Sequence, residues 1–193
     1  LSVNFLKGLA LYAKGELEPA AFQFRAALQM SSSFLPAAFY LGACYAAGGR
    51  DDEAAGAWQT SLISEGDARI IFDVLADAWL RLKDGPQAMA ILTEARERWP
   101  DDDVFLPRLA AAQVMLKQPG PAMDTLETYI GRHAGDTDVI FLALRLLYDA
   151  HANGSVMRGK PEDAALAAKL ATLYRAAAGP HVALADRWVA FIR

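Results

Sequence analysis

The sequence predicts an all-α fold built from antiparallel helix pairs, and three observations carry this prediction. The apolar residues are mainly Ala, Leu and aromatic side chains with few β-branched ones, which favours closely packed helices over sheet. Small and large residues recur every 34 positions along the chain. Short segments rich in Gly, Pro and Asp divide the apolar stretches at the places where helices would have to turn.

The 34-residue spacing is followed by small and large side chains alike. Gly8 and Gly42 are one period apart on what would be the first helix of each pair. On the second helix the small series is Ala20, Ala54, Ala88 and Ala122. The large series is Phe24, Trp58, Leu92 and Leu126. Small residues let two helices approach closely, so the period predicts one helix pair per repeat and a core shared between neighbouring pairs.

Turn residues give the expected boundaries. Those inside the first three pairs are Gly15, the pair Gly48 and Gly49, and the run Asp84, Gly85, Pro86. Turns between later pairs are indicated by Pro100 with the three Asp residues after it, and by Gly135 with Asp136. We therefore expect a single array over 1–193, with repeats at 1–34, 35–68, 69–102, 103–136 and 137–178. A longer loop is expected at 152–160, and a capping helix at 180–193.

The repeat resembles the tetratricopeptide repeat, whose pattern is W-x2-L-G-x2-Y, then A-x3-F, then P. The second repeat matches it at Leu41, Gly42, Tyr45, Ala54 and Trp58. The third repeat matches it at Phe72, Leu75, Ala76, Trp79, Ala88, Leu92 and Pro100. The resemblance implies a right-handed α-solenoid that acts as a protein-interaction scaffold and binds a partner segment in its concave groove. We expect Trp58, Trp79 and Trp188 in the core and Trp99 partly exposed at a repeat junction.

Charge and cysteine content exclude several classes of function. The net charge of -4 offers no basic patch for a phosphate backbone, so nucleic acid is not an expected partner. The uncharged stretch from Ala26 to Gly49 contains Pro36 and three Ser residues, so it reads as helix, turn, helix rather than as a membrane span. One cysteine, Cys44, cannot form an internal disulfide. No targeting signal is recognised in the chain, and its compartment is left open.

Candidate catalytic, cofactor and metal sites find little support. Gly154, Gly159 and Lys160 spell most of a phosphate-binding loop, but Pro161 stands where Ser or Thr would hold magnesium, and no strand precedes. The three His residues are spread over different elements without metal-ligand spacing. We therefore expect no enzyme activity, no cofactor and no metal. The Ala-rich composition, with Arg preferred to Lys, favours a bacterial source, and the absence of an initiator Met before Leu1 favours a module of a larger protein.

Residues for the partner-binding groove follow from the resemblance, which places ligands at fixed positions of each first helix. Carried over to this chain and extended by a nearby Arg, the candidates are Phe5, Leu9, Tyr12, Phe39, Ala43, Asp73, Asp77, Leu80, Arg81, Arg108, Phe141, Arg145 and Tyr148. The same positions in the fourth repeat are Pro107, Ala111, Val114 and Met115, and Asp149 belongs to the set in the fifth.

These residues suggest a protein or peptide partner with an apolar anchor for the Phe5, Tyr12 and Phe39 end. Asp73 and Asp77 lie on one helix face, so a partner Lys or Arg would relieve their repulsion. Two alternatives remain open for the roles of these residues. The aromatic side chains could pack against neighbouring first helices, and Arg81 or Arg108 could neutralise the acidic pair. Self-association as a homodimer is the alternative function.

Overall fold

A computed structural model describes residues 2–64 and 69–193 and confirms the all-α fold. This part of the chain contains eleven α-helices and one 3-10 turn, and it contains no strand. The expected boundary between the second and third repeats, at residue 68, lies outside the described residues. The chain divides into two compact units, Leu1–Pro100 and Asp101–Arg193.

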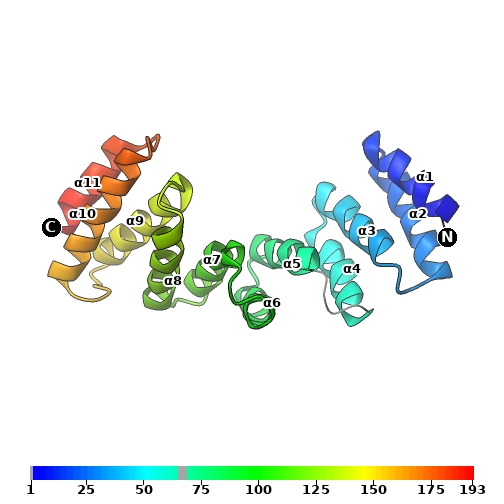
Figure 1. Cartoon of the computed structure of the whole chain (residues 1–193), viewed down its shortest axis with the longest axis horizontal. Helices are drawn as coiled ribbons and strands as arrows, with labels where there is room; N and C mark the ends of the chain where they lie inside the picture. Colours follow the sequence, from blue (N-terminus) through cyan, green and yellow to red (C-terminus); the bar gives the residue numbers. More distant parts are fainter. Residues whose placement is uncertain (1, 65–68) are drawn as a thin grey trace. The chain divides into compact units, whose positions relative to one another are not determined.

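The first unit contains three helix pairs in which each helix packs against the next along the chain, with α1 beside α2 and α3 beside α4 (Figure 1). Its helices are α1 (Ser2–Ala13), α2 (Leu17–Met30), α3 (Leu35–Ala47), α4 (Asp51–Ser64), α5 (Arg69–Arg81) and α6 (Gly85–Arg98). We call α1, α3 and α5 first helices because each opens a pair. The uncharged stretch that includes Pro36 thus divides between α2, a turn and α3, as expected. No helix in the described part of the chain is long and apolar enough to span a membrane.

The second unit contains two helix pairs and a final helix that packs against both members of the pair before it. Its elements are η1 (Asp103–Phe105), α7 (Leu106–Met115), α8 (Pro119–Arg132), α9 (Thr137–Ala152), α10 (Lys160–Ala176) and α11 (Val182–Ile192). Here α7, α9 and α11 are the first helices. A cluster of buried apolar residues that includes Leu126, Leu144 and Leu170 forms the core of this unit.

Close contact between the two helices of a pair explains the small-residue series. Trp58 is only 3% exposed, and its ring packs on Gly42, where an added Cβ would overlap the indole. Gly8 stands in the same relation to Phe24. The Trp58 indole N–H also donates a hydrogen bond of 3.1 Å to the backbone oxygen of Phe39, which fixes α4 to α3.

The other Trp residues are less buried than Trp58. Trp79 and Trp188 are half-buried, so the expectation of a core position is right for Trp58 only. Trp99 is half-buried, as expected, and its ring centroid lies 5.2 Å from that of Phe72. These indoles lie where the core meets the surface, which suits a large apolar ring with one polar atom.

A left-handed backbone residue ends the first helix in four successive pairs, again at intervals of 34. The residues and their φ values are Gly15 (77°), Gly49 (73°), Lys83 (59°) and Lys117 (59°). In each turn the next residue donates its N–H to the carbonyl five positions earlier, as in Arg50 to Tyr45 and Asp84 to Trp79. This bond satisfies a carbonyl at the helix end that has no partner inside the helix.

Two exposed glycines test how much the left-handed turn depends on glycine. The Gly49→Ala variant should lower the free energy of unfolding by about 1 kcal/mol, because its φ is unfavourable for a residue with a Cβ. Gly56→Ala, inside α4 and with open space for a Cβ, should raise it by about 0.5 to 1 kcal/mol. Urea unfolding followed by circular dichroism measures both, and a shift of the same sign in the two variants would contradict this explanation.

Candidate partner-binding surface

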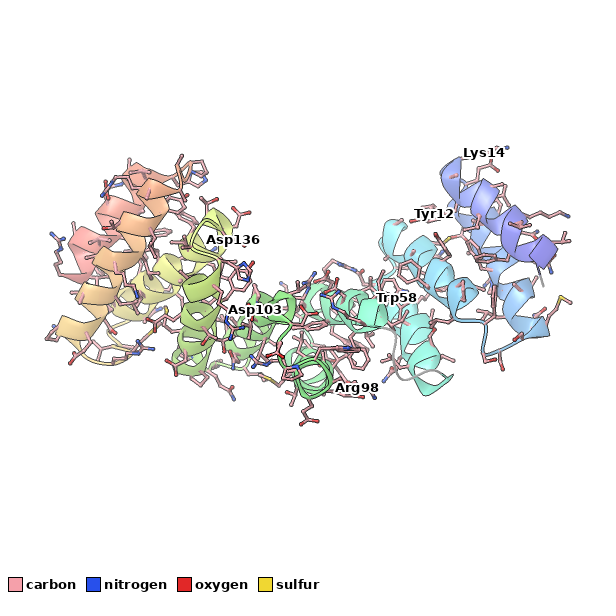
Figure 2. The ribbon with its side chains drawn as sticks, in the orientation of Figure 1. Tyr12, Lys14, Trp58, Arg98, Asp103 and Asp136 are labelled. Atoms are coloured by element: carbon pink, nitrogen blue, oxygen red, sulfur yellow. The ribbon has the colours of Figure 1, made fainter. Side chains whose placement is uncertain are left out.

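Two of the predicted residues on α1 contact Tyr40 of α3, which the prediction did not include. Phe5, Leu9 and Tyr12 are all half-buried on α1. The ring of Tyr40, on α3, lies 6.0 Å from Phe5 and 5.5 Å from Tyr12 between ring centroids (Figure 2 labels Tyr12). Phe5 therefore packs against the neighbouring first helix, in agreement with the first of the two alternatives.

The α3 residues belong to the same group. Phe39 and Ala43 are half-buried, and the Phe39 ring lies 5.4 Å from that of Tyr40, nearly perpendicular to it. We call Phe5, Tyr12, Phe39 and Tyr40 the N-terminal aromatic cluster. Each of these rings packs on another ring, so they leave no empty pocket between them. A partner could contact only the part of each half-buried ring that remains exposed.

The acidic pair, Asp73 and Asp77, lies on α5 together with Arg81, which forms an ion pair with another helix. Asp73 and Asp77 are half-buried, as is Leu80, and Arg81 is exposed. The Arg81 guanidinium contacts Asp51 of α4, with its Nη2 2.7 Å from the carboxylate. The pKa of Arg81 is raised, chiefly by this hydrogen bond and further by the charges of Asp51 and Asp77. Arg81 therefore acts electrostatically on Asp77 while it is held by Asp51.

Arg108 is the other cation that the sequence offers for the acidic pair. It lies on α7, in the second compact unit, and is half-buried. Its Nη1 donates a hydrogen bond of 3.2 Å to the backbone oxygen of Val104, one turn earlier.

Aromatic residues of α9 are covered by the final helix. The Phe141 ring centroid lies 4.9 Å from that of Trp188, and the Tyr148 ring stacks on Trp188 at 5.3 Å. Phe191 closes the edge of Tyr148 at 5.2 Å. We call these four residues the C-terminal aromatic cluster. Arg145 projects from the same helix, exposed, with its Nε 3.5 Å from Asp149.

An open groove of about 430 Å³ lies between the C-terminal ends of α7 and α9, and we call it the α7–α9 groove. Its lining residues are Val114, Lys117, Pro119, Leu146, Asp149, Ala150, Asn153 and Ser155. Sequence reasoning had placed Val114 and Asp149 on this surface. It missed the other six, because half of them come from the turns after α7 and α9.

A second groove lies on the other side of the unit, between the second helices α8 and α10. It measures about 270 Å³ and is lined by Glu127, Ile130, Gly131, Ala134, Leu166, Lys169, Leu170 and Leu173. None of the predicted residues lies in this α8–α10 groove.

Helix geometry explains which residues the prediction missed. Positions 5 and 12 of a first helix face the following first helix, whereas positions 6, 10, 13 and 14 face the preceding one. Tyr40 is at position 6, and Leu146 and Ala150 are at positions 10 and 14. Comparison of both faces of each first helix would have found them.

The histidines are held by separate partners. His133 contacts Asp103 at 3.2 Å, beside a 2.8 Å ion pair from Arg132 to the same carboxylate. His151 contacts the buried carboxylate of Asp163 at 2.9 Å. Nowhere in residues 2–64 and 69–193 do three His, Cys, Asp or Glu side chains gather as metal ligands.

Two hydroxyl or thiol groups with raised pKa values have structural surroundings. Tyr129 donates a hydrogen bond of 2.9 Å to Asp136, the N-cap residue of α9, and burial together with this bond raises the Tyr129 pKa (Figure 2 labels Asp136). Cys44 is buried in α3, and desolvation raises its thiol pKa to about 11, with Glu18 adding to the effect and Arg50 opposing it. A protonated, buried thiol is a poor nucleophile.

The segment that resembles a phosphate-binding loop connects two helices. Gly154 and Gly159 lie in the connection from α9, and Lys160 opens α10. The carboxylate of Asp163 accepts hydrogen bonds from the backbone N–H groups of Met157 and Arg158. These amides are therefore already occupied by an anion from the chain itself.

Comparison with known proteins shows the fold. No family model and no curated protein matches this chain. Among solved structures, MamA superposes with a TM-score of 0.74 at 13% identity, covering 91% of this chain and 88% of that one. YrrB, described as a TPR protein with an unusual peptide-binding site, gives 0.73 at 18% identity, covering 95% and 89%. This chain has the tetratricopeptide repeat fold.

A further solved structure with this tetratricopeptide repeat fold comes from Pseudomonas aeruginosa. It is PilF, with a TM-score of 0.67 at 18% identity over 91% of this chain and 75% of that one. At such identities the likeness extends to the fold alone. The α-solenoid of antiparallel helix pairs predicted from the 34-residue period is thereby confirmed.

The C-terminal aromatic cluster should contribute strongly to stability. Trp188→Ala should lower the free energy of unfolding by about 2 to 3 kcal/mol, because it removes the ring that contacts both Phe141 and Tyr148. Phe191→Ala, at a residue that is 56% exposed, should cost less than about 1 kcal/mol. Urea unfolding of the two variants makes the comparison. Equal losses would show that α11 is not held through Trp188.

Proposed function

We propose that this chain is a protein-interaction scaffold that holds a segment of another protein on the surface of its first helices. The observation that carries the proposal is the series of half-buried apolar and aromatic side chains on these helices, together with the open α7–α9 groove. Half-buried apolar groups beside a groove are what a partner segment can cover. The tetratricopeptide fold shared with YrrB, described as having a peptide-binding site, supports the same function. No catalytic role is proposed.

The contact residues proposed for this surface are those expected from the sequence. On the first unit they are Phe5, Leu9, Tyr12, Phe39, Ala43, Asp73, Asp77, Leu80 and Arg81. On the second unit they are Arg108, Phe141, Arg145 and Tyr148. We also propose that the scaffold is a module of a larger bacterial protein, and the Ala-rich, Arg-over-Lys composition favours the bacterial source.

For the first unit we propose a partner with a Lys or Arg next to an apolar anchor. Asp73 and Asp77 are one helical turn apart and half-buried, which makes their mutual repulsion costly. Arg81 relieves part of this, but Asp51 holds it. A cation from a partner would be attracted to this acidic pair in addition to the contacts that the pair makes within the chain, and it would add specificity and association rate more than affinity.

Self-association is the second candidate, and exposed apolar residues at the start of the chain favour it. Val3 and Leu6, on the same side of α1, are 63% and 61% exposed, and Phe22 on α2 is 62% exposed. Side chains of this size in water are a common feature of surfaces that bind another chain.

A peptide-library selection tests the scaffold function. The parent chain should enrich peptides with a basic residue beside an apolar one, and the Asp73→Asn, Asp77→Asn double variant should lose the preference for the basic residue. The reason is that removal of both carboxylates removes the attraction for a cation. Sequencing of the selected pools measures the enrichment.

A matched control removes two exposed carboxylates elsewhere, with Asp101→Asn and Asp138→Asn, and should leave the selection unchanged. If the parent chain selects no peptides, the scaffold function is wrong. If the double variant selects the same basic peptides as the parent, the cation binds at another place.

A further inference from the structure

Repeat positions allow the α7–α9 groove to be compared with the next junction between first helices. Val114 occupies the position that Tyr148 occupies one period later. Ala150 occupies the position of Phe191, when α11 is aligned through the match of Ala185 with Ala76. Two residues that line the groove, Val114 and Ala150, are thus the counterparts of aromatic residues at the next junction.

At the next junction these positions are filled with rings. Tyr148 and Phe191 are in contact at 5.2 Å between α9 and α11, and Trp188 stacks on Tyr148. At the first junction of the chain, Tyr12 has the same repeat position and contacts Tyr40 of α3 at 5.5 Å. Between α7 and α9 the positions carry Val and Ala, and an open groove takes the place of the rings.

Part of the apolar surface of the groove remains accessible. Val114 is 40% exposed and its neighbour Met115 is 39% exposed. Across the groove on α9, Ala150 is half-buried and Leu146 is only 8% exposed, so the accessible apolar surface comes mainly from Val114. The side chain of Val114 and part of Ala150 are therefore in contact with water here, whereas rings cover the corresponding surface between α9 and α11. Burial of this surface by an aromatic side chain would be favourable.

Lys117, on the rim of the groove, is a cation without a carboxylate partner among the described residues. Lys117 is exposed, and its backbone is fixed by the left-handed turn that ends α7. In the described part of the chain no acidic side chain pairs with it. Asp149, also on the rim, is itself paired with Arg145 at 3.5 Å. The charge left for a ligand to neutralise is therefore positive.

We propose that the α7–α9 groove binds an aromatic side chain of a partner segment, with a carboxylate next to it bound by Lys117. The ligand ring takes the place that Tyr148 and Phe191 fill at the following junction. This inference rests on the proposed scaffold function and adds to it a second anchor, whose chemistry is acidic and aromatic.

A second copy of this chain fits the groove less well than a different protein. Among residues 2–64 and 69–193, the exposed aromatic residues are Phe22 and Phe191. Glu18 lies one turn before Phe22 on α2, but its carboxylate is already held by Arg50 at 2.5 Å. The residue one turn before Phe191 is the cation Arg187, so neither ring brings an unpaired carboxylate with it. The charge of Lys117 therefore favours a partner with another sequence.

Surface plasmon resonance with the immobilised full chain tests the proposal. The probes are three acetylated and amidated hexapeptides, Gly-Ser-Tyr-Asp-Ser-Gly, Gly-Ser-Ala-Asp-Ser-Gly and Gly-Ser-Tyr-Lys-Ser-Gly. The first should bind roughly tenfold or more tighter than the second, since a buried aromatic anchor commonly carries most of the affinity of such a contact. It should also bind more tightly than the third, because Lys117 attracts the Asp and repels the Lys.

Variants locate the binding to the groove. Val114→Tyr combined with Ala150→Phe places in the groove the rings found at the next junction, and it should weaken the Tyr-Asp peptide roughly tenfold or more. Lys117→Glu should reverse the preference in favour of the Tyr-Lys peptide. Its matched control, Lys169→Glu on α10, makes the same change of charge elsewhere and should leave the preference unchanged. Circular dichroism shows whether each variant is folded. If the variant with both rings, which we call the filled variant, is unfolded, the peptide preference of Lys117→Glu alone tests whether the peptide binds in the groove.

Three results would overturn the proposal. One is equal binding of the Tyr-Asp and Ala-Asp peptides, and another is unchanged affinity in the filled variant. The third is a concentration-dependent dimer in sedimentation that becomes a monomer in the variant with Val114→Tyr and Ala150→Phe. That result would show that a second copy of the chain occupies the groove. If library-selected peptides still bind the filled variant, the scaffold function stands and only the aromatic anchor is wrong.

Discussion

Close approach of the two helices in a pair is the constraint on which the remaining structure depends. Gly42 lets the Trp58 ring pack directly on α3, and the indole N–H then bonds the Phe39 carbonyl. This contact fixes the rotation of α3 about its own axis. Phe39 and Ala43 consequently remain half-buried while Leu41 and Tyr45 enter the core. The binding surface of the first helices is thus the side that pair packing leaves uncovered.

The repeat could be predicted from the sequence because its requirements are local. A small residue and a large one at a fixed spacing are visible without knowledge of the partner helix. The left-handed conformation of Lys83 and Lys117 could not be predicted from residue type, since Lys rarely adopts positive φ, although the 34-residue interval from Gly49 does point to these two positions. The contacts of Tyr40 and Trp188 with neighbouring first helices also depend on side-chain direction across two helices, which spacing along one helix does not determine.

The α7–α9 groove was hidden from sequence reasoning for two further reasons. It results from small side chains at Val114 and Ala150, and a pattern search for large residues does not detect them. Part of its rim comes from the turn after α9, where Ser155 donates its N–H to the carbonyl of Ala150. The buried carboxylate of Asp163 holds the rest of this connection through two backbone amides, so the rim has a defined shape.

Which face of the helix pairs binds a partner can be measured by amide chemical-shift mapping of the isotope-labelled chain with a library-selected peptide. Binding on first helices predicts the largest shifts in α1, α3, α5, α7 or α9, with small shifts in the second helices α8 and α10. Shifts concentrated on Ile130, Leu166 and Leu170, in the α8–α10 groove, would contradict it.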